Sequence, residues 1–319
     1  MNSGCFRKEE NSNAKAVGMK PSEGGAASSA EQETAVIMGS EASSENGKEV
    51  HYCGFNISAL PEELFMHVLM FVPPTDVVKR CSLVCKHWLA VSRDQSMWRR
   101  KCEQEGKYVP SVKGLHLTPK DFMRIYFKNP YGRNLLRNTR AQSMEYWYKP
   151  GNYLSASVET SPAGADPIAD FVPPEEIQGK PVQNWVTSYQ FTTITQQVHL
   201  LAEGCSAEVL DNVRPPIYAS AWCAARWDCG AKFQLVVKLL NKDQTTVDAV
   251  EKDINMSDHP DRRIWHKVEH TFTDYKPGVR SIKFQMGGVD TQFWAGNYGS
   301  KFTLPCLRFI FSKTDEDKQ

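Results

Sequence analysis

Residues 270–296 read HTFTDYKPGVRSIKFQMGGVDTQFWAG, and this stretch indicates the fold of the larger part of the chain. Every second residue from 282 to 286 is apolar, and the residues between them are polar. This alternation is typical of a β-strand with one face in a core and the other in solvent. Turn-forming residues stand on both sides, Lys-Pro-Gly at 276–278 and Gly-Gly at 287–288. We therefore predict a strand between two turns, followed by a loop with two adjacent aromatic residues.

The same period of two recurs through the chain after Asn129-Pro130. Residues 233–239 and residues 307–311 place large apolar side chains at every second position. Proline and glycine pairs, such as Pro215-Pro216, separate these runs. Many short strands with such punctuation predict an antiparallel β-sandwich.

The residues before this half follow the period of an α-helix. Between Leu64 and Val72 the apolar residues fall on one helical face. Pro61 suits the first turn of that helix, and Pro73-Pro74 should end it. Thr75 or Asp76 is expected to cap a second short helix, and Thr118-Pro119-Lys120-Asp121 is expected to cap another. The predicted fold class is thus α+β multidomain: a small all-α domain, a helical linker and an all-β antiparallel sandwich.

Composition excludes several classes of protein. The 319 residues hold 38 Lys and Arg against 37 Asp and Glu, which argues against a basic nucleic-acid-binding face. No apolar run approaches the roughly 20 residues that span a bilayer, so we expect no membrane insertion. The N-terminus shows no secretory signal, and we expect a cytoplasmic protein. The nine cysteines form no Cys-x-x-Cys pair, and neither zinc nor a disulfide framework is expected.

The helical stretch resembles an F-box. The resemblance is carried by Leu60-Pro61-Glu62-Glu63-Leu64, Leu69, Pro73, Asp76-Val77, Leu83-Val84-Cys85-Lys86-His87-Trp88 and Trp98. F-boxes dock onto the Skp adaptor of SCF (Skp–cullin–F-box) ubiquitin ligases, so the resemblance implies Skp and cullin as partners. A helical piece of about 48 residues is too small to bury all of its own apolar residues. The implied adaptor-binding residues are Leu60, Pro61, Leu64, Leu69, Val77 and Trp88. The alternative is that they form the core of an ordinary helical bundle.

The C-terminal half resembles the F-box-associated (FBA) domain of F-box proteins that recognise N-glycans on misfolded glycoproteins. The most specific residues are 270–280 and 287–296, and shorter matches include Arg133–Asn138 and Leu201–Gly204. In that family the domain is a ten-stranded, jelly-roll-like antiparallel sandwich, and helices join it to the F-box. The resemblance implies the same architecture here.

The family's sugar site lies in loops at one end of the sandwich. Its floor is an aromatic pair followed by a small or basic residue, and a second region supplies another aromatic wall. A flat exposed ring can cover the apolar C–H face of a pyranose, and a glycine lets the backbone approach closely. The residues that the resemblance places in this site are Phe293, Trp294, Ala295, Gly296, Tyr189 and Phe191.

This sequence departs from the family's pattern at that site. The best-known glycan binders carry Tyr-Trp-Lys where this chain has Phe293-Trp294-Ala295, so a hydroxyl and an ammonium are missing. After Ala-Glu-Gly the family usually carries Tyr-Trp, and here Cys205-Ser206 follows.

The two resemblances predict how the chain is divided. The expected parts are a disordered tail at 1–50, an F-box at 58–105, a helical linker at 106–130, an FBA β-sandwich at 131–312 and a C-terminal tail at 313–319.

The predicted function is that of a substrate-recognition subunit of an SCF ubiquitin ligase. It would bind the chitobiose core of high-mannose N-glycans on misfolded glycoproteins and direct them to ubiquitination and ER-associated degradation. No catalytic motif is present, so we expect a non-catalytic adaptor without metal or cofactor. One alternative is an SCF receptor for a protein motif. Another is a free lectin or chaperone that seldom engages the ligase.

Overall fold

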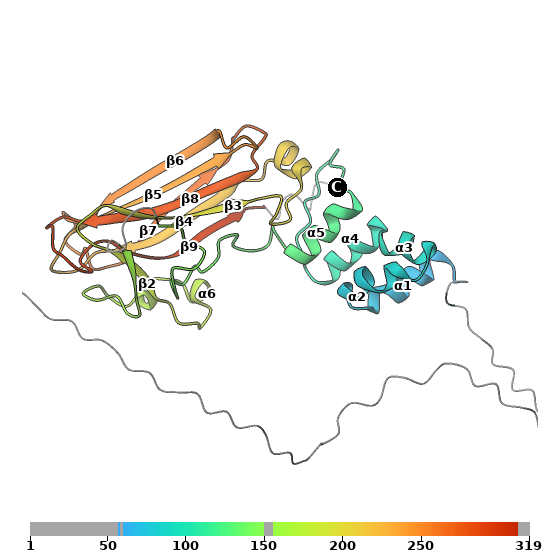
Figure 1. Ribbon diagram of the computed structural model, residues 1–319, viewed down its shortest axis with the longest axis horizontal. Coiled ribbons are helices and arrows are strands. Elements are labelled where there is room, and N and C mark those ends of the chain that lie inside the picture. The colour runs from blue at the N-terminus through green and yellow to red at the C-terminus, as the bar shows by residue number, and fades with distance from the viewer. Residues whose placement is uncertain (1–56, 58–59, 150–155, 312–319) are drawn as a thin grey trace, which may run out of the picture. The chain divides into compact units, whose positions relative to one another are not determined.

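The computed structural model describes residues 57, 60–149 and 156–311 (Figure 1). The chain divides into two units, Met1–Gly54 and Phe55–Gln319, and all described residues belong to the second. The tails predicted at 1–50 and 313–319 lie outside the described residues.

Short helices make up the first part of the described chain. They are α1 Glu62–Phe71, α2 Pro74–Lys79, the 3-10 turn η2 Cys81–Leu83, α3 Lys86–Ser92 and α4 Gln95–Gln104. Helix α1 starts directly after Pro61, which is its N-cap and not part of its first turn, and it stops before Pro73 as predicted. The predicted cap of the second helix is wrong. Pro73 is the N-cap of α2, so Thr75 and Asp76 lie within the helix, because Pro74 already has the φ that a first helical turn requires.

The helices share a core in which two buried side chains donate hydrogen bonds to backbone carbonyl groups. Trp98 is fully buried, and its indole Nε1 donates to the carbonyl oxygen of Ser92 at 2.8 Å. The buried Lys101 ammonium donates to the carbonyl oxygens of Met70 and Val72, each at 3.1 Å. A cation thus satisfies two carbonyl groups at the C-terminal end of α1, where the helix dipole favours positive charge.

Helix α5, Pro119–Lys128, follows in the predicted linker. Thr118 and Asp121 form the capping box that the sequence indicates: each side chain accepts a hydrogen bond from the other residue's backbone N–H. Its buried face carries Phe122, Ile125 and Tyr126.

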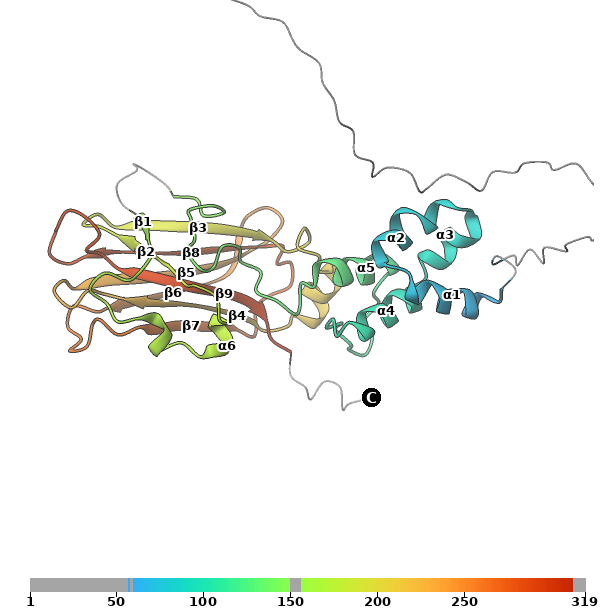
Figure 2. The same cartoon turned by 90° about the horizontal axis from the view of Figure 1, so that it is seen from below.

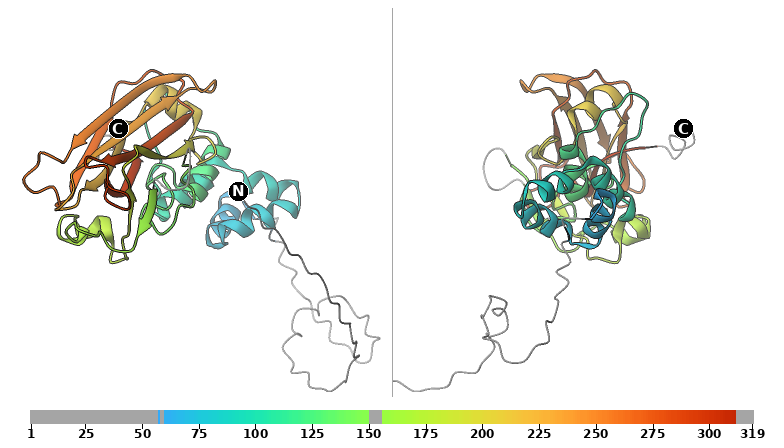
Figure 3. Two further views of the ribbon diagram at one scale, coloured as in Figure 1. Left: turned by 60° about the vertical axis from the view of Figure 1, so that its left-hand side comes forward. Right: turned by 90° about the vertical axis from the view of Figure 1, so that its right-hand side faces the viewer.

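Two antiparallel sheets form the rest of the described chain, and they lie face to face as two layers (Figure 2, Figure 3). The five-stranded sheet has the order β1-β2-β9-β4-β7 and the four-stranded sheet the order β3-β8-β5-β6. The strands are β1 Ala156–Glu159, β2 Asn184–Thr187, β3 Thr192–His199, β4 Ile217–Ala224, β5 Ala231–Leu240, β6 Thr246–Asn255, β7 His266–Phe272, β8 Ser281–Asp290 and β9 Lys301–Phe309. The predicted sandwich is confirmed, with nine strands in the described residues.

Aromatic side chains from both sheets meet between the layers. Phe233 of β5 and Phe302 of β9 have ring centroids 5.7 Å apart, and Trp185 of β2 lies 6.1 Å from Phe302. Phe284 of β8 is fully buried, as the alternation in the opening stretch predicts. A smaller cluster, which includes Trp222, packs under η3 Ile168–Asp170 and α6 Pro174–Ile177.

The turn predicted at Gly287-Gly288 is wrong, because β8 runs through both residues to Asp290. These glycines allow a close approach of the neighbouring strands. A Cβ atom on Gly287 would lie 2.1 Å from the carbonyl oxygen of Thr192, and one on Gly288 would lie 2.2 Å from that of Lys232. Glycine here therefore marks tight packing within a strand and not a change of direction.

Strand β6 is one edge of the four-stranded sheet, and most of its side chains are exposed or half-buried. Four of its ten residues are charged: Asp248, Glu251, Lys252 and Asp253.

Three general features bear on function. All seven cysteines in the described part of the chain are unpaired. Within the same residues no group of His, Cys, Asp and Glu could hold a metal ion. No helix in the described ranges has the length and apolarity needed to cross a membrane.

Candidate functional site

A buried carboxylate shapes the loop between β8 and β9. Asp290 is only 3% exposed, and it accepts hydrogen bonds from the backbone N–H groups of the residues that follow it. Its Oδ1 accepts from Gln292 at 3.0 Å and from Phe293 at 2.6 Å, and its Oδ2 accepts from Trp294 at 3.1 Å. The loop is therefore held by one fixed acceptor, as at a helix N-terminus.

This tight turn directs two rings outward. Phe293 has a φ of 59°, in the left-handed region that few non-glycine residues adopt, and its side chain is 80% exposed. Trp294 is 42% exposed, and its ring centroid lies 5.2 Å from that of Tyr298, with an interplanar angle of 90°. Gly296 has a φ of 112°, which explains why glycine follows the aromatic pair. The predicted residues Phe293 to Gly296 thus lie on one exposed, fixed loop.

The loop between β2 and β3 lies directly beside it. The backbone N–H of Asp290 donates to the carbonyl oxygen of Ser188 at 3.1 Å, and that of Gly299 donates to Thr187 at 2.9 Å. Tyr189 and Phe191 follow in this loop and are 41% and 51% exposed. All six residues predicted for the glycan site therefore lie in two neighbouring loops. That they bind a glycan stays a prediction.

A third loop, between β4 and β5, belongs to the same end of the sandwich and was missed from the sequence. The backbone N–H of Thr291 donates to Gly230 in this loop at 3.0 Å. The loop carries Arg226, the exposed Trp227 and Asp228. These residues are more than 60 positions from Trp294 in the sequence, so no local spacing signals the contact.

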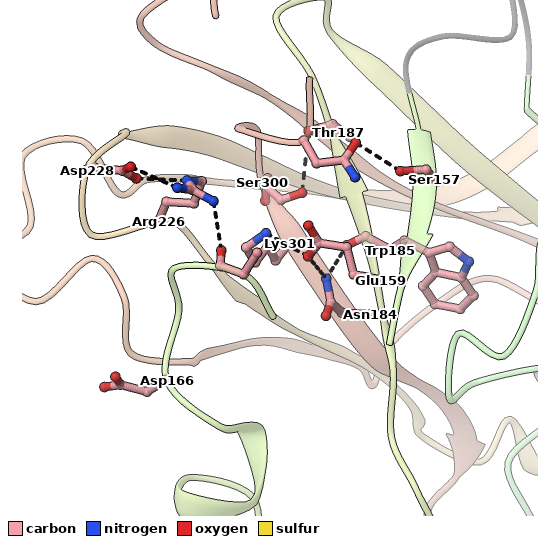
Figure 4. A network of polar contacts seen from close by, with 12 residues as sticks. Ser157, Glu159, Asp166, Asn184, Trp185, Thr187, Arg226, Asp228, Ser300 and Lys301 are labelled. Carbon is pink, nitrogen blue, oxygen red and sulfur yellow. Dashed lines mark hydrogen bonds and ion pairs between the residues drawn. The ribbon is translucent and has the colours of Figure 1, made fainter. Parts of the chain in front are cut away.

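The charged groups in these loops and at the adjoining strand ends are paired (Figure 4). The Arg226 guanidinium holds the pKa of the Asp228 carboxyl below its usual range through two hydrogen bonds of 2.8 Å. Lys301 is fully buried and lies 2.7 Å from Glu159, which also accepts from Asn184 at 2.9 Å. Burial lowers the pKa of Lys301, and the Glu159 carboxylate opposes that shift. These charges are paired with each other, so the exposed aromatic faces are what the arrangement offers for binding.

The residues predicted to contact the adaptor fall into two groups. Pro61 and Leu64 are exposed, and Leu60 and Trp88 are half-buried. Leu69 and Val77, expected in a partner groove, are instead 1% and 0% exposed. They face the core of the helical part, and a contact of these two residues with the adaptor stays a prediction. Their apolar character serves packing.

Other apolar residues are exposed in the same helical part and were not predicted. Val68 and Phe71 of α1 are 38% and 79% exposed, and Leu83 and Val84 in the turn before α3 are 80% and 60% exposed. Exposed apolar side chains concentrated in so short a segment are candidates for contact with a partner. We name Leu64, Val68, Phe71, Leu83 and Val84 the exposed apolar set.

The chain matches known proteins in both parts. Residues 57–104 match the F-box-like model, and residues 126–308 match the F-box associated region. F-box only protein 44 of Mus musculus is 35% identical over 249 residues, covering 78% of this chain and 94% of that protein. F-box only protein 6 of Homo sapiens is 36% identical, covering 78% and 82%. F-box only protein 2 of Bos taurus is 31% identical, covering 77% and 82%.

Identity extends over both the helical part and the sandwich, and the matched regions occur in the same order as the two parts of the fold. The chain therefore belongs to the family of F-box only proteins in which an F-box-like domain is followed by an F-box associated region.

Proposed function

We propose that this chain is the receptor subunit of an SCF ubiquitin ligase whose loops after β2 and β8 bind N-glycans of misfolded glycoproteins. Its family consists of non-catalytic adaptors of such ligases. The observation that carries the glycan proposal is the pair of exposed rings, Phe293 and Trp294, on a loop fixed by a buried carboxylate.

Rigid, exposed aromatic rings suit a sugar for physical reasons. A pyranose presents an apolar C–H face, and a ring that is already fixed loses little conformational entropy when the sugar stacks on it. Stacking between two aromatic rings contributes about 0.5–1.5 kcal/mol, and we take the same range for a sugar stacked on one ring. A micromolar lectin has only about 8 kcal/mol of binding free energy in total. One or two such rings are therefore a large share of the affinity.

The ligand we propose is the inner, chitobiose-containing part of a high-mannose N-glycan. A glycoprotein that has unfolded and reached the cytoplasm exposes this part. The receptor would then bring lysines of the bound client close to the ubiquitin-charged enzyme, so its contribution is proximity. The exposed apolar set is the surface that we propose for the Skp adaptor, which links the receptor to the cullin.

A second candidate ligand is a protein surface. Phe293 carries no hydroxyl, and Ala295 carries no ammonium, so the tip of the loop is more apolar than in the well-known glycan binders of the family. Exposed aromatic residues are also frequent anchors of protein–protein interfaces. This composition favours recognition of an apolar protein motif if no sugar binds.

Two matched substitutions test both halves of the proposal. Trp294→Ala and Phe71→Ala each remove one exposed aromatic ring, the first from the loop and the second from α1. The full-length chain would be co-expressed with Skp, and binding measured on a glycan array and by titration with chitobiose-containing glycans. We expect Trp294→Ala to weaken glycan binding about tenfold or more, corresponding to about 1.4 kcal/mol, and to leave Skp co-purification intact. Phe71→Ala should do the reverse.

Thermal melting of both variants, monitored by circular dichroism, is the control for folding. Wild-type chain that binds no glycan on the array would refute the glycan ligand and favour the protein motif. A Phe293→Tyr variant restores the hydroxyl of the family's glycan binders and should tighten binding modestly. Retention of wild-type glycan affinity by Trp294→Ala would show that the site lies elsewhere.

A further inference from the structure

Arg226 lies where three loops of the sandwich meet, and its guanidinium contacts one residue in each: Asp228, Ala163 and Tyr298. Figure 4 shows Arg226 beside Asp228. Within its own loop, Nε and Nη2 donate to the two carboxylate oxygens of Asp228, each at 2.8 Å. Nη1 donates to the carbonyl oxygen of Ala163, between β1 and η3, at 3.3 Å. The guanidinium carbon also lies 4.6 Å from the ring centre of Tyr298, between β8 and β9. One side chain therefore joins three separate segments.

Tyr298 continues this series of contacts to the proposed ligand site. Its ring meets Trp294 at 5.2 Å with an interplanar angle of 90°. The Arg226 side chain is only 18% exposed, whereas Trp294 is 42% exposed. The series thus leads from a largely buried cation, through a tyrosine ring, to an exposed indole.

The ion pair fixes the orientation of the guanidinium plane. Because both carboxylate oxygens of Asp228 are engaged, the planar fork cannot rotate without losing a hydrogen bond. The face of a fixed guanidinium is a suitable support for an aromatic ring. A lysine ammonium in its place would keep the charge, but it offers neither a two-point contact nor a flat face.

A second pair stabilises the sheet beneath this contact. Lys301 is the first residue of β9 and Glu159 the last of β1, and their side chains are 2.7 Å apart and almost fully buried. The negative charge of Glu159 also contributes to raising the pKa of Arg226, although the hydrogen bonds with Asp228 contribute most. Arg226 thus remains charged, and the Lys301–Glu159 pair links the ends of the neighbouring strands β9 and β1.

We propose that Arg226 is a positioning residue of the ligand site. It holds Tyr298 in the orientation against which Trp294 packs, and so sets the direction of the exposed face of Trp294. The binding consequence rests on the proposed function, because it assumes that a ligand stacks on this indole. The orientation itself does not depend on that assumption.

The test compares Arg226→Lys with Arg263→Lys in the full-length chain. Arg263 is the matched control, since it pairs with Asp166 at 3.3 Å in a nearby loop but is 58% exposed and has no described contact with Tyr298. Two further variants test which part of Tyr298 makes the contact with Arg226 and Trp294. Tyr298→Leu removes the ring, and Tyr298→Phe keeps the ring and removes only the hydroxyl.

Two measurements are made on each variant. The first is the indole N–H resonance of Trp294 in ligand-free, 15N-tryptophan-labelled protein, assigned from its loss in Trp294→Phe. The second is the affinity for a chitobiose-containing glycan. We expect Arg226→Lys and Tyr298→Leu to move the resonance and weaken binding by about 3- to 10-fold, at most the loss expected when the Trp294 ring itself is removed. Arg263→Lys and Tyr298→Phe should match wild type in both.

An unmoved Trp294 resonance in Arg226→Lys overturns the positioning role. So does a moved resonance with unchanged glycan affinity, because the orientation would then not matter for binding. If wild type binds no glycan, the proposed function fails, while the ligand-free resonance still decides whether Arg226 orients Trp294. Arg226→Lys keeps the charge, and an unchanged melting temperature shows that the sandwich is intact.

Discussion

Asp290→Ala tests whether one buried carboxylate maintains the loop between β8 and β9, which carries the proposed ligand site. The carboxylate accepts three backbone hydrogen bonds, two at Oδ1 and one at Oδ2. A typical hydrogen bond contributes about 1 kcal/mol net, so the three together stabilise the loop by about 3 kcal/mol. Phe293 also has a left-handed φ of 59°, which costs about 1 kcal/mol that these bonds offset. Without the acceptor, we expect the loop to open locally while the sandwich remains folded.

Hydrogen exchange measures this opening residue by residue. The amides of Phe293 and Trp294 should lose protection by on the order of 100-fold in Asp290→Ala, corresponding to about 3 kcal/mol. Asp290→Asn should have a smaller effect, because its remaining carbonyl oxygen can still serve the two N–H groups now bound at Oδ1. Asp274→Ala is the control, since Asp274 is exposed and its only described contact is a 3.4 Å bond from Thr273. Native exchange rates at Phe293 in Asp290→Ala would refute the reasoning.

Three further outcomes are expected. Leu69→Ala should destabilise the helical part by about 2–5 kcal/mol in chemical denaturation, because this side chain is 1% exposed in a packed core; a loss below about 0.5 kcal/mol would contradict its burial. Glu159→Gln should lower stability by about 3–5 kcal/mol, because it leaves the buried Lys301 ammonium without an opposite charge; an unchanged melting temperature would argue against a charged Lys301. The hydrogen bond from Arg280 holds the pKa of Asp211 below its ordinary 3.8, so the stability from this carboxylate is present above pH 3.8 and is lost as pH falls through the lowered folded-state pKa. Asp211→Asn should therefore flatten the acid limb of stability against pH, measured by urea denaturation between about pH 2 and pH 5, and an unchanged acid limb would assign it to other carboxylates.

Local patterns in the sequence predicted local structure well. The helix that begins after Pro61 and the capping box of Thr118 and Asp121 depend on residues a few positions apart, and both are present. The strand around Phe284 follows from its alternation. In each case the residues that interact are only a few positions apart, so residues that are close in the sequence are also close in space.

Contacts between distant segments could not be predicted in this way. Leu64 and Leu69 are both apolar residues of α1, yet one is 54% exposed and the other 1%. Composition shows that such residues avoid water, but not whether a neighbour in the same chain or a partner covers them. The pairing of Arg226 with Tyr298 joins residues 72 positions apart, and its geometry exists only once both loops are folded. The family resemblance predicted that the loop between β8 and β9 carries the ligand site. It did not predict which residues, such as Asp290, fix the conformation of that loop.

The charged edge strand β6 has a consequence under the proposed function, in which the clients are misfolded glycoproteins. Partly unfolded polypeptides expose extended segments that pair readily with any open sheet edge. Such pairing is opposed by the charged residues of β6, because the side chains of an added strand would lie against charges that they do not pair. These residues are Asp248, Glu251, Lys252 and Asp253. A receptor of the proposed kind, which would meet aggregation-prone chains through its loops, is thereby protected along this edge from joining their aggregates.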